Sequence, residues 1–256
     1  MANWAVLPEG PSPKPPTPSD SRSRLVPMLV AEELLLCLTN PVTGRHLVSA
    51  SELDIAVGGG LLLELALRER VDVAGPQDAV RRGSLVVRDP TPTGDPVLDL
   101  ALSNVLGRVG RKPPGVVSAL GRGQRHALYR RLAEAGILRA EDSTVLGIFH
   151  SRRWPAADRT HVQDLRGRLA VALQAGATTD TRLAALVSLL LALDAVHKVV
   201  FPPGVGLDKR ALKARATRIA EGEWAGRAVK DAIAGVNAAV SAAAMATIIA
   251  GGSSGS

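Results

Sequence analysis

Aromatic side chains are scarce in this chain of 256 residues, where they make up 2% of the sequence. The core must therefore come from Leu, Val, Ala and Ile, and a composition so rich in Leu and Ala favours packed helices. No tandem aromatic residues are present on which the bases of a single-stranded nucleic acid could stack, which weakens that kind of function.

Cysteine is almost absent. Cys37 is the only one, which excludes a disulfide within the chain and makes a cysteine metal site improbable. It lies in the apolar segment VAEELLLCL, so we expect it to be a small buried side chain.

The motifs of common catalytic sites are also missing. The five histidines form neither HxxxH nor HExxH, there is no GxSxG, and the GGG run at 58–60 is neither GxGxxG nor a phosphate-binding loop. The carboxylates are scattered over predicted helix faces. We therefore expect a protein that is not an enzyme and that holds no cofactor and no metal.

Positive charge is abundant by contrast. The net charge is +7 and the isoelectric point is about 10.3. Phosphate head groups, nucleic acid or an acidic protein would suit such a surface, and arginine supplies most of the charge. The Ala-, Arg- and Gly-rich composition also indicates a bacterium with GC-rich coding.

The termini differ in composition from the rest of the chain. Residues 1–24 are rich in Pro and Ser and predict a disordered tail, residues 25–250 predict one domain, and residues 251–256 predict a flexible tail. Residues 1–20 lack the apolar core of a secretory signal, so we expect a cytoplasmic chain. The apolar stretches 183–200 and 232–250 read as buried helices rather than membrane spans.

Three consecutive glycines interrupt an apolar helical stretch at residues 53–70, LDIAVGGGLLLELALRER. Each glycine inside a helix costs about 1 kcal/mol relative to alanine, so the run needs a reason, such as close approach of another backbone or of a ligand head group. The leucines after it predict a buried surface, and Glu64, Arg68, Glu69 and Arg70 predict a solvated side.

Local patterns predict the other elements. Helices are expected at 30–38, from Ser51 onward, at 97–106, 113–120 and 124–135, over most of 156–250, and as one long helix from a cap at 178–180 to residue 200. Short strands are expected at 71–74 and 84–88. A hairpin is expected from residues 137–138 and 145–149, with its turn at Glu141, Asp142 and Ser143.

Two arginines form the main candidate binding site. Arg122 and Arg125 are three residues apart, so we expect them to share a helix face at the entrance to the 124–135 helix, with Tyr129 on the same side. Backbone N–H groups and the helix dipole at a helix N-terminus also favour an anion. The pair therefore predicts a phosphate site, against the alternative of two solvated surface arginines.

The second candidate is the apolar end of the predicted hairpin. Val145, Leu146, Ile148 and Phe149 could enter a bilayer, with Arg152 and Arg153 at anionic head groups and Trp154 at the interface. The alternative is a hairpin that packs inward.

The same segment allows a different function. Two short helices followed by a hairpin have the order of a winged helix-turn-helix, with Arg125, Arg130 and Arg131 facing the DNA major groove. Most of the chain would then need a separate role, so nucleic acid is the less favoured partner. A protein-interaction scaffold without lipid binding is the third possibility.

Several motifs in register resemble one family. LVAEELLLCL, GGLLLELALRERV at 59–71, DPTPTGDPVLD at 89–99 and LAEAGIL at 132–138 are similar in order and spacing to the Golgi phosphoprotein 3 family, over about residues 24–250. The resemblance implies a mainly α fold: a single compact helical domain with a few short β-hairpins at one end. It also implies a non-catalytic peripheral membrane protein that binds phosphatidylinositol 4-phosphate and whose partners are anionic phospholipid head groups.

The resemblance also bears on the binding residues. The family's two later lipid-binding arginines correspond to Arg122 and Arg125, and its apolar hairpin tip to residues 145–148. Its earlier arginine falls on Gly58 and its tryptophan falls near Ser49, so those two groups are replaced here.

Overall fold

The computed structural model describes residues 28–145, 149–200, 206–222 and 227–252. The fold is mainly α, as predicted, with 61% of the chain helical and two small antiparallel strand pairs in the described part. The helices are α1 Val30–Cys37, α2 Ala50–Leu67, α3 Pro96–Leu106, α4 Pro113–Gly121, α5 Gln124–Glu134, α6 Arg159–Ala175, α7 Thr181–Ala192, α8 Val196–Val200, α9 Lys209–Glu221 and α10 Arg227–Gly252.

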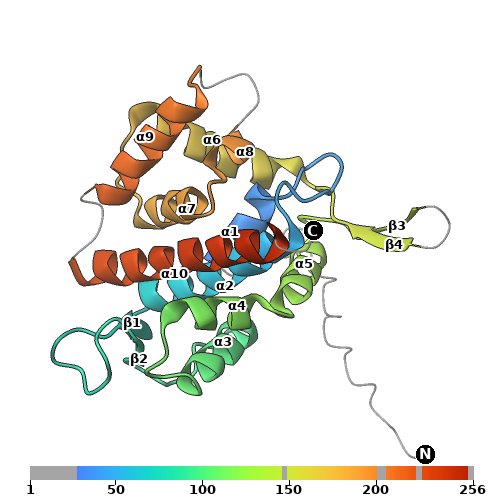
Figure 1. The fold of residues 1–256 in the computed structure, drawn as a ribbon. Helices are drawn as coiled ribbons and strands as arrows, with labels where there is room; N and C mark the ends of the chain where they lie inside the picture. The colour runs from blue at the N-terminus through green and yellow to red at the C-terminus, as the bar shows by residue number, and fades with distance from the viewer. Residues whose placement is uncertain (1–27, 146–148, 201–205, 223–226, 253–256) are drawn as a thin grey trace, which may run out of the picture.

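The strands form two separate pairs. β1 (Val71–Val73) pairs with β2 (Leu85–Val87), and β3 (Glu141–Val145) pairs with β4 (Phe149–Arg153). The pairs lie on opposite sides of the helical body rather than together at one end as predicted (Figure 1). The second pair projects from the body beside α5 (Figure 1).

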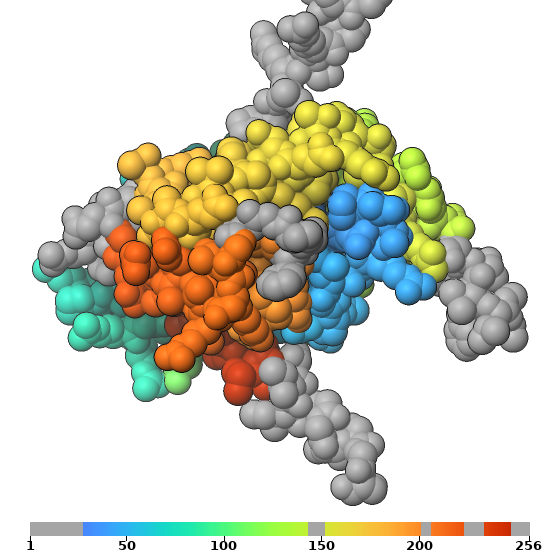
Figure 2. All heavy atoms as spheres, turned by 90° about the horizontal axis from the view of Figure 1, so that it is seen from above, coloured from blue at the N-terminus to red at the C-terminus, as the bar shows by residue number. Residues whose placement is uncertain are grey.

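Helix α2 forms the centre of the fold. It packs against α1, α4 and α10, and α10 runs along it in Figure 1. Helices α6 and α9 form much of the outer surface above this layer (Figure 2). Because neighbours surround α2, it is buried on every side from Leu53 to Ala66 apart from a half-buried Asp54, which explains why its sequence is apolar around its whole circumference.

Each of the three glycines of α2 allows a different neighbouring helix to pack closely against it. A Cβ atom on Gly58 would lie 2.0 Å from the carbonyl oxygen of Val117 in α4, and one on Gly60 would lie 2.7 Å from the Cα atom of Ala31 in α1. A Cβ atom on Gly59 would lie 2.5 Å from the Cγ2 atom of Val240 in α10. The expected close approach of another backbone thus occurs at two of the three positions.

Buried charges fasten α1 to α2. The Glu64 carboxylate accepts a hydrogen bond from the Val30 amide at 2.9 Å and pairs with Arg182 of α7 at 3.0 Å and with Arg68 at 2.9 Å. The prediction that Glu64 lies on a solvated side is therefore wrong, since this residue is 3% exposed. The buried Glu64 side chain can stay charged because its hydrogen-bond and ion-pair partners offset the cost of removing it from water.

The structure corrects several predicted boundaries. Helix α2 begins one residue earlier than predicted, with Ser49 as its N-cap, and Ser49 and Glu52 form the capping box. The predicted hairpin is out of register, since Glu141, Asp142 and Ser143 lie within β3 rather than in a turn. The predicted long helix ending at residue 200 is split into α7 and α8, with Asp194 between them at a φ of 49°.

The predicted tails fall largely outside the described residues. The predicted disordered tail at 1–24 lies there entirely, as do residues 253–256. Residues 251 and 252 belong to α10, so the helix continues past the predicted end of the domain at residue 250.

Candidate functional site

The corner between α4 and α5 carries the first candidate arginine. Gly121 ends α4 so close to α2 that a Cβ atom there would lie 1.7 Å from the carbonyl oxygen of Asp54. Gly123 then turns the chain at a φ of 83°, which favours glycine, and α5 begins at Gln124. Arg122 lies between the two glycines and is exposed, and its side chain makes no hydrogen bond or ion pair with any described residue.

Arg125 has a different environment. Its side chain is 17% exposed, and its Nη1 atom lies 3.0 Å from the Asp54 carboxylate and donates to the Ala50 carbonyl oxygen at 2.9 Å. The prediction that Arg122 and Arg125 share a helix face is wrong, because Arg122 precedes α5. Arg125 ties α5 to α2. Of the two candidate arginines, only Arg122 has a guanidinium group without a partner among the described residues.

The N-terminus of α5 adds to the positive potential at this corner. Its N-cap is Gly123, which provides no side-chain acceptor, and its first turn contains no acidic residue. The uncapped N–H groups and the helix dipole therefore favour an anion close to Arg122.

A cavity of about 630 Å³ lies beside this corner, between α5 and the β3–β4 pair. Gly123, His126, Arg130, Arg152 and Trp154 contribute to its wall. The Arg130 and Arg152 guanidinium groups meet Glu134 at 3.7 Å and Asp142 at 2.8 Å, and all four side chains are well exposed. Exposed pairs of this kind are weak, so both arginines can turn to an incoming anion.

A stack of three rings supports the wall of the cavity. Trp154 stacks on Tyr129 with ring centroids 5.0 Å apart, and Tyr129 stacks on His46 at 5.7 Å. The Tyr129 hydroxyl lies 2.6 Å from the hydroxyl of Thr39, and burial raises the pKa of Tyr129. Trp154 is 4% exposed, so its predicted place at a membrane interface is wrong. No sequence pattern indicated this stack, because its members come from distant parts of the chain.

His46 is affected by the same surroundings. Burial, together with the nearby Arg125 guanidinium, lowers the pKa of His46. Its Nε2 atom is buried and has no hydrogen-bond partner among the described residues. The ring is therefore stabilised in its neutral form.

The tip of the predicted membrane-inserting hairpin is only partly described. Leu146 and Ile148 lie outside the described residues, while Val145 and Phe149 pair with each other at the ends of β3 and β4. The candidate residues from this segment therefore stay a prediction.

The winged-helix interpretation requires a row of free cations on α5. Arg131 instead binds Glu32 at 2.9 Å and Asp95 at 2.6 Å, and Arg125 is bound to α2. Of the three arginines considered for the major groove, Arg130 alone is well exposed.

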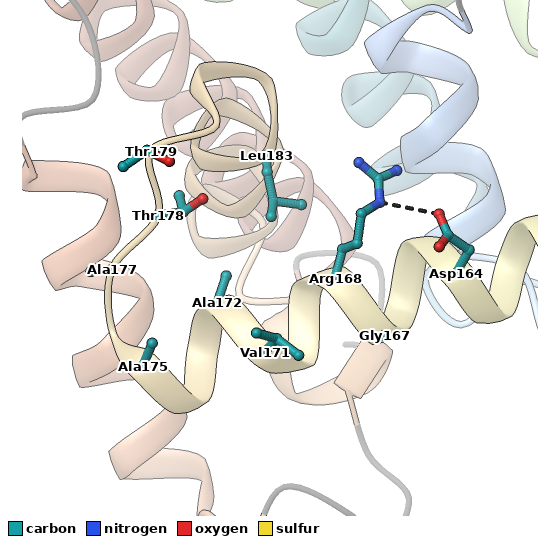
Figure 3. A pocket seen from close by; sticks show the side chains of 10 residues that line it. All are labelled: Asp164, Gly167, Arg168, Val171, Ala172, Ala175, Ala177, Thr178, Thr179 and Leu183. Carbon is teal, nitrogen blue, oxygen red and sulfur yellow. Dashed lines mark hydrogen bonds and ion pairs between the residues drawn. The ribbon is translucent and has the colours of Figure 1, made fainter.

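A different groove, of about 730 Å³, lies between α6, the loop that follows it and the start of α7 (Figure 3). Its wall is mostly apolar, with Val171, Ala172 and Leu183 from the two helices (Figure 3). Its arginine, Arg168, lies 3.2 Å from Asp164 and 3.9 Å from Asp180. The charge in this groove is thus already balanced, and the groove is less suited to an anion than the α4–α5 corner.

The described part of the chain provides neither a metal cluster nor a membrane-spanning helix. No group of three His, Cys, Asp or Glu side chains there could hold a metal ion. None of the helices in that part is both long and apolar enough to span a bilayer.

The family model for Golgi phosphoprotein 3 (GPP34) matches residues 30–236, which is most of the chain. The chain belongs to the Golgi phosphoprotein 3 family. No curated protein matches it.

The DPTPTGDP segment that resembles the Golgi phosphoprotein 3 family has a structural role here. Asp95 caps α3 by accepting the Val97 amide at 2.9 Å, and it also binds Arg131. Asp99 accepts the hydroxyl of Thr93 at 2.7 Å, and its pKa is lowered by these hydrogen bonds. The segment therefore fixes the start of α3 and its contact with α5.

The two positions at which the resemblance implies a tryptophan and an arginine have structural roles here. Ser49 is the N-cap of α2, and its hydroxyl accepts the Glu52 amide at 3.2 Å. Gly58 lies directly under the backbone of α4, where no side chain fits. This chain therefore belongs to the family without either of these two side chains, and the exposed Arg122 lies at the α4–α5 corner.

Proposed function

We propose that this member of the Golgi phosphoprotein 3 family is a non-catalytic peripheral membrane protein that binds anionic phospholipid head groups at the cytoplasmic surface of a membrane. The observation that carries the proposal is the unpaired, exposed guanidinium group of Arg122 at the uncapped N-terminus of α5. A phosphate there would receive charge-assisted hydrogen bonds from arginine and the main chain.

The neighbouring cavity extends the same chemistry. Arg130 and Arg152 on its rim hold only exposed partners, so they can be recruited by a head group at small cost. The β3–β4 pair projects beside it, with Val145 and Phe149 at the ends of its strands. We propose that these two residues, together with Leu146 and Ile148 of the sequence between them, insert shallowly into the bilayer.

The head group itself is the finer part of the proposal. Family resemblance favours phosphatidylinositol 4-phosphate, but Gly58 and Ser49 stand where the resemblance gives an arginine and a tryptophan. We therefore propose that anionic charge dominates recognition, and that phosphatidylinositol 4-phosphate is bound with a small preference over phosphatidylglycerol.

Co-sedimentation with vesicles tests this function. The whole chain should bind vesicles containing phosphatidylinositol 4-phosphate or phosphatidylglycerol and should not bind phosphatidylcholine alone. Arg122→Ala should weaken binding about fivefold, because a basic residue near an anionic surface contributes about 1 kcal/mol. Arg210→Ala, which removes an exposed arginine from α9, is the matched control and should leave binding nearly unchanged.

Arg125→Ala should not be used alone, because it also breaks the ion pair to Asp54. The melting temperature of each variant should therefore be compared with that of the natural chain. Equal binding by the Arg122→Ala variant and the natural chain, at equal stability, would contradict the assignment of this corner.

A further inference from the structure

A third cavity, of about 440 Å³, lies at the other end of α4 from Arg122. It is bounded by the loop between β1 and β2, the start of α4 and the middle of α10. Gly235 allows α10 to pass close to β1, since a Cβ atom on it would lie 2.4 Å from the Cγ2 atom of Val73. The cavity is therefore formed by three elements that pack together, rather than by one loop.

Three cations surround this cavity without a carboxylate. Arg81, Arg82 and Lys112 are exposed, and their side chains make no hydrogen bond or ion pair with any described residue. Two carboxylates of the β1–β2 region, Asp72 and Asp78, both bind Arg88, at 3.1 Å and 2.5 Å. Arg88 offsets one of these two negative charges, so Arg81, Arg82 and Lys112 together with this ion-pair group keep a net positive charge.

The wall also contains a hydroxyl group. Ser84 is 1% exposed and lines the cavity. Its backbone N–H donates to the Arg81 carbonyl oxygen and its carbonyl oxygen accepts from the Ala74 N–H, which fixes the residue in the wall. A serine hydroxyl can donate a hydrogen bond to a phosphate oxygen.

The rest of the cavity wall is apolar, and the N-terminus of α4 faces the cavity. Val73, Pro114 and Ala239 supply apolar surface. The positive end of α4 points here, and its N-cap residue, Lys112, makes no side-chain capping bond. Pro113 and Pro114 carry no N–H group, so the side chains must provide most of the donors.

We propose that this cavity is a second anion site, which binds a phosphate ester through Arg81, Arg82, Lys112 and the hydroxyl of Ser84, with the apolar part of the ligand on the opposite wall. The phosphate can be carried by a lipid or by a small soluble ester, because both present the same oxygens. The site is independent of Arg122, since all of α4 separates the two.

Calorimetric titration of the whole chain tests the proposal with two soluble probes: a short-chain phosphatidylglycerol below its micelle concentration, and inorganic phosphate. Arg81→Ala/Arg82→Ala should lower the affinity at least about tenfold, because hydrogen bonds to charged groups contribute about 1.5–3 kcal/mol. Ser84→Ala should lower it by about threefold or more, in line with a neutral hydrogen bond. Binding of both probes would point to a soluble phosphate, and binding of the lipid alone to a lipid source; either supports the site when the variants lose it.

Controls separate this site from the proposed membrane corner. Arg210→Ala/Lys213→Ala removes two exposed cations from α9 and should leave the titration unchanged. Arg122→Ala should remove only the binding at the α4–α5 corner, so the affinity lost in Arg81→Ala/Arg82→Ala should be the same with and without Arg122→Ala. The proposal is overturned if neither probe binds, if Arg81→Ala/Arg82→Ala binds as tightly as the natural chain, or if the α9 control loses as much affinity. Loss of duplex DNA binding in the Arg81→Ala/Arg82→Ala variant, with neither soluble probe bound, would also overturn it in favour of nucleic acid.

Discussion

Single residues decide how closely the central helices approach one another. Gly58 and Gly121 face each other where α2 and α4 cross, and each would bring a Cβ atom into the backbone of the other helix. Gly167 in α6 is the opposite case, since nothing lies within 4 Å of the position its Cβ would take. The same residue type therefore has opposite consequences at these positions.

We predict that Gly58→Ala lowers the free energy of unfolding by about 1–3 kcal/mol, because overpacking outweighs the gain in helix propensity. Gly167→Ala is the matched control and should raise it by about 0.5–1 kcal/mol. Urea unfolding followed by circular dichroism measures both. A Gly58→Ala variant as stable as the natural chain would show that α4 can move away without cost.

His46 gives a prediction on pH. Its pKa in the folded state is lowered from 6.5, so below that pH the unfolded chain binds a proton that the folded chain does not. The free energy of unfolding should therefore fall as the pH falls from about 7.5 to about 5.5, by at most about 1.4 kcal/mol per pH unit for this group.

His46→Phe should flatten part of this dependence while keeping a ring against Tyr129. The pKa of His197 is lowered too, chiefly by burial, so His46→Phe/His197→Phe should flatten it further. An unchanged slope in His46→Phe would mean that this ring is not the group that titrates.

At the residue scale, spacing alone could not separate the roles of the two candidate arginines. Arg122 and Arg125 are three apart in either case, but the glycines around Arg122 take it out of the helix and Asp54 captures Arg125. Both causes lie in contacts with α2, which local sequence does not contain.

Helices and strands were predicted correctly where the sequence contains clear capping residues or turn residues. The strands at β1 and β2, the Asp180 cap of α7 and the starts of α4 and α5 agree with prediction. The break at Asp194 was missed because a non-glycine residue with positive φ leaves no mark in an apolar run. The register of β3 was missed because polar Glu141 and Asp142 resemble a turn, yet they form ion pairs on an exposed strand pair.

At the element scale, Glu64 determines how firmly α1 docks on α2. We predict that Glu64→Ala lowers the free energy of unfolding by about 3–5 kcal/mol, because it leaves the Val30 amide without its buried acceptor and removes one of the two carboxylates that pair with Arg182. Glu134→Ala, on the exposed face of α5, should change it by less than about 0.5 kcal/mol. Similar unfolding midpoints for the two variants would contradict this role for Glu64.

For the whole molecule, composition and motif order predicted the fold class and the family, and both are confirmed. A chain rich in leucine and alanine buries its apolar side chains most readily by packing helices together. The fold class can therefore be predicted without knowing which residues contact one another. The candidate site depends on which arginines form ion pairs within the fold. Only the structure shows that Arg122 has no such partner among the described residues, whereas other arginines of the region have one.

The distribution of free charge predicts a salt dependence. Binding to phosphatidylglycerol vesicles should weaken steadily as salt rises from about 0.1 M to 1 M, because the screening length falls from about 10 Å to about 3 Å. Co-sedimentation across a salt series measures this, with phosphatidylcholine vesicles as the control. Binding that persists unchanged at 1 M salt would mean that apolar insertion, rather than arginine, holds the protein on the membrane.

The crossing of α2 and α4 at Gly58 also limits which residues can occupy position 58. A relative's arginine could be introduced there only after α4 had shifted, since its Cβ would lie 2.0 Å from the Val117 carbonyl oxygen. An arginine at this position would thus disrupt the packing of α2 against α4, the helix that Arg122 follows. Position 58 can take a side chain only together with changes in α4 that widen the distance between the two helices.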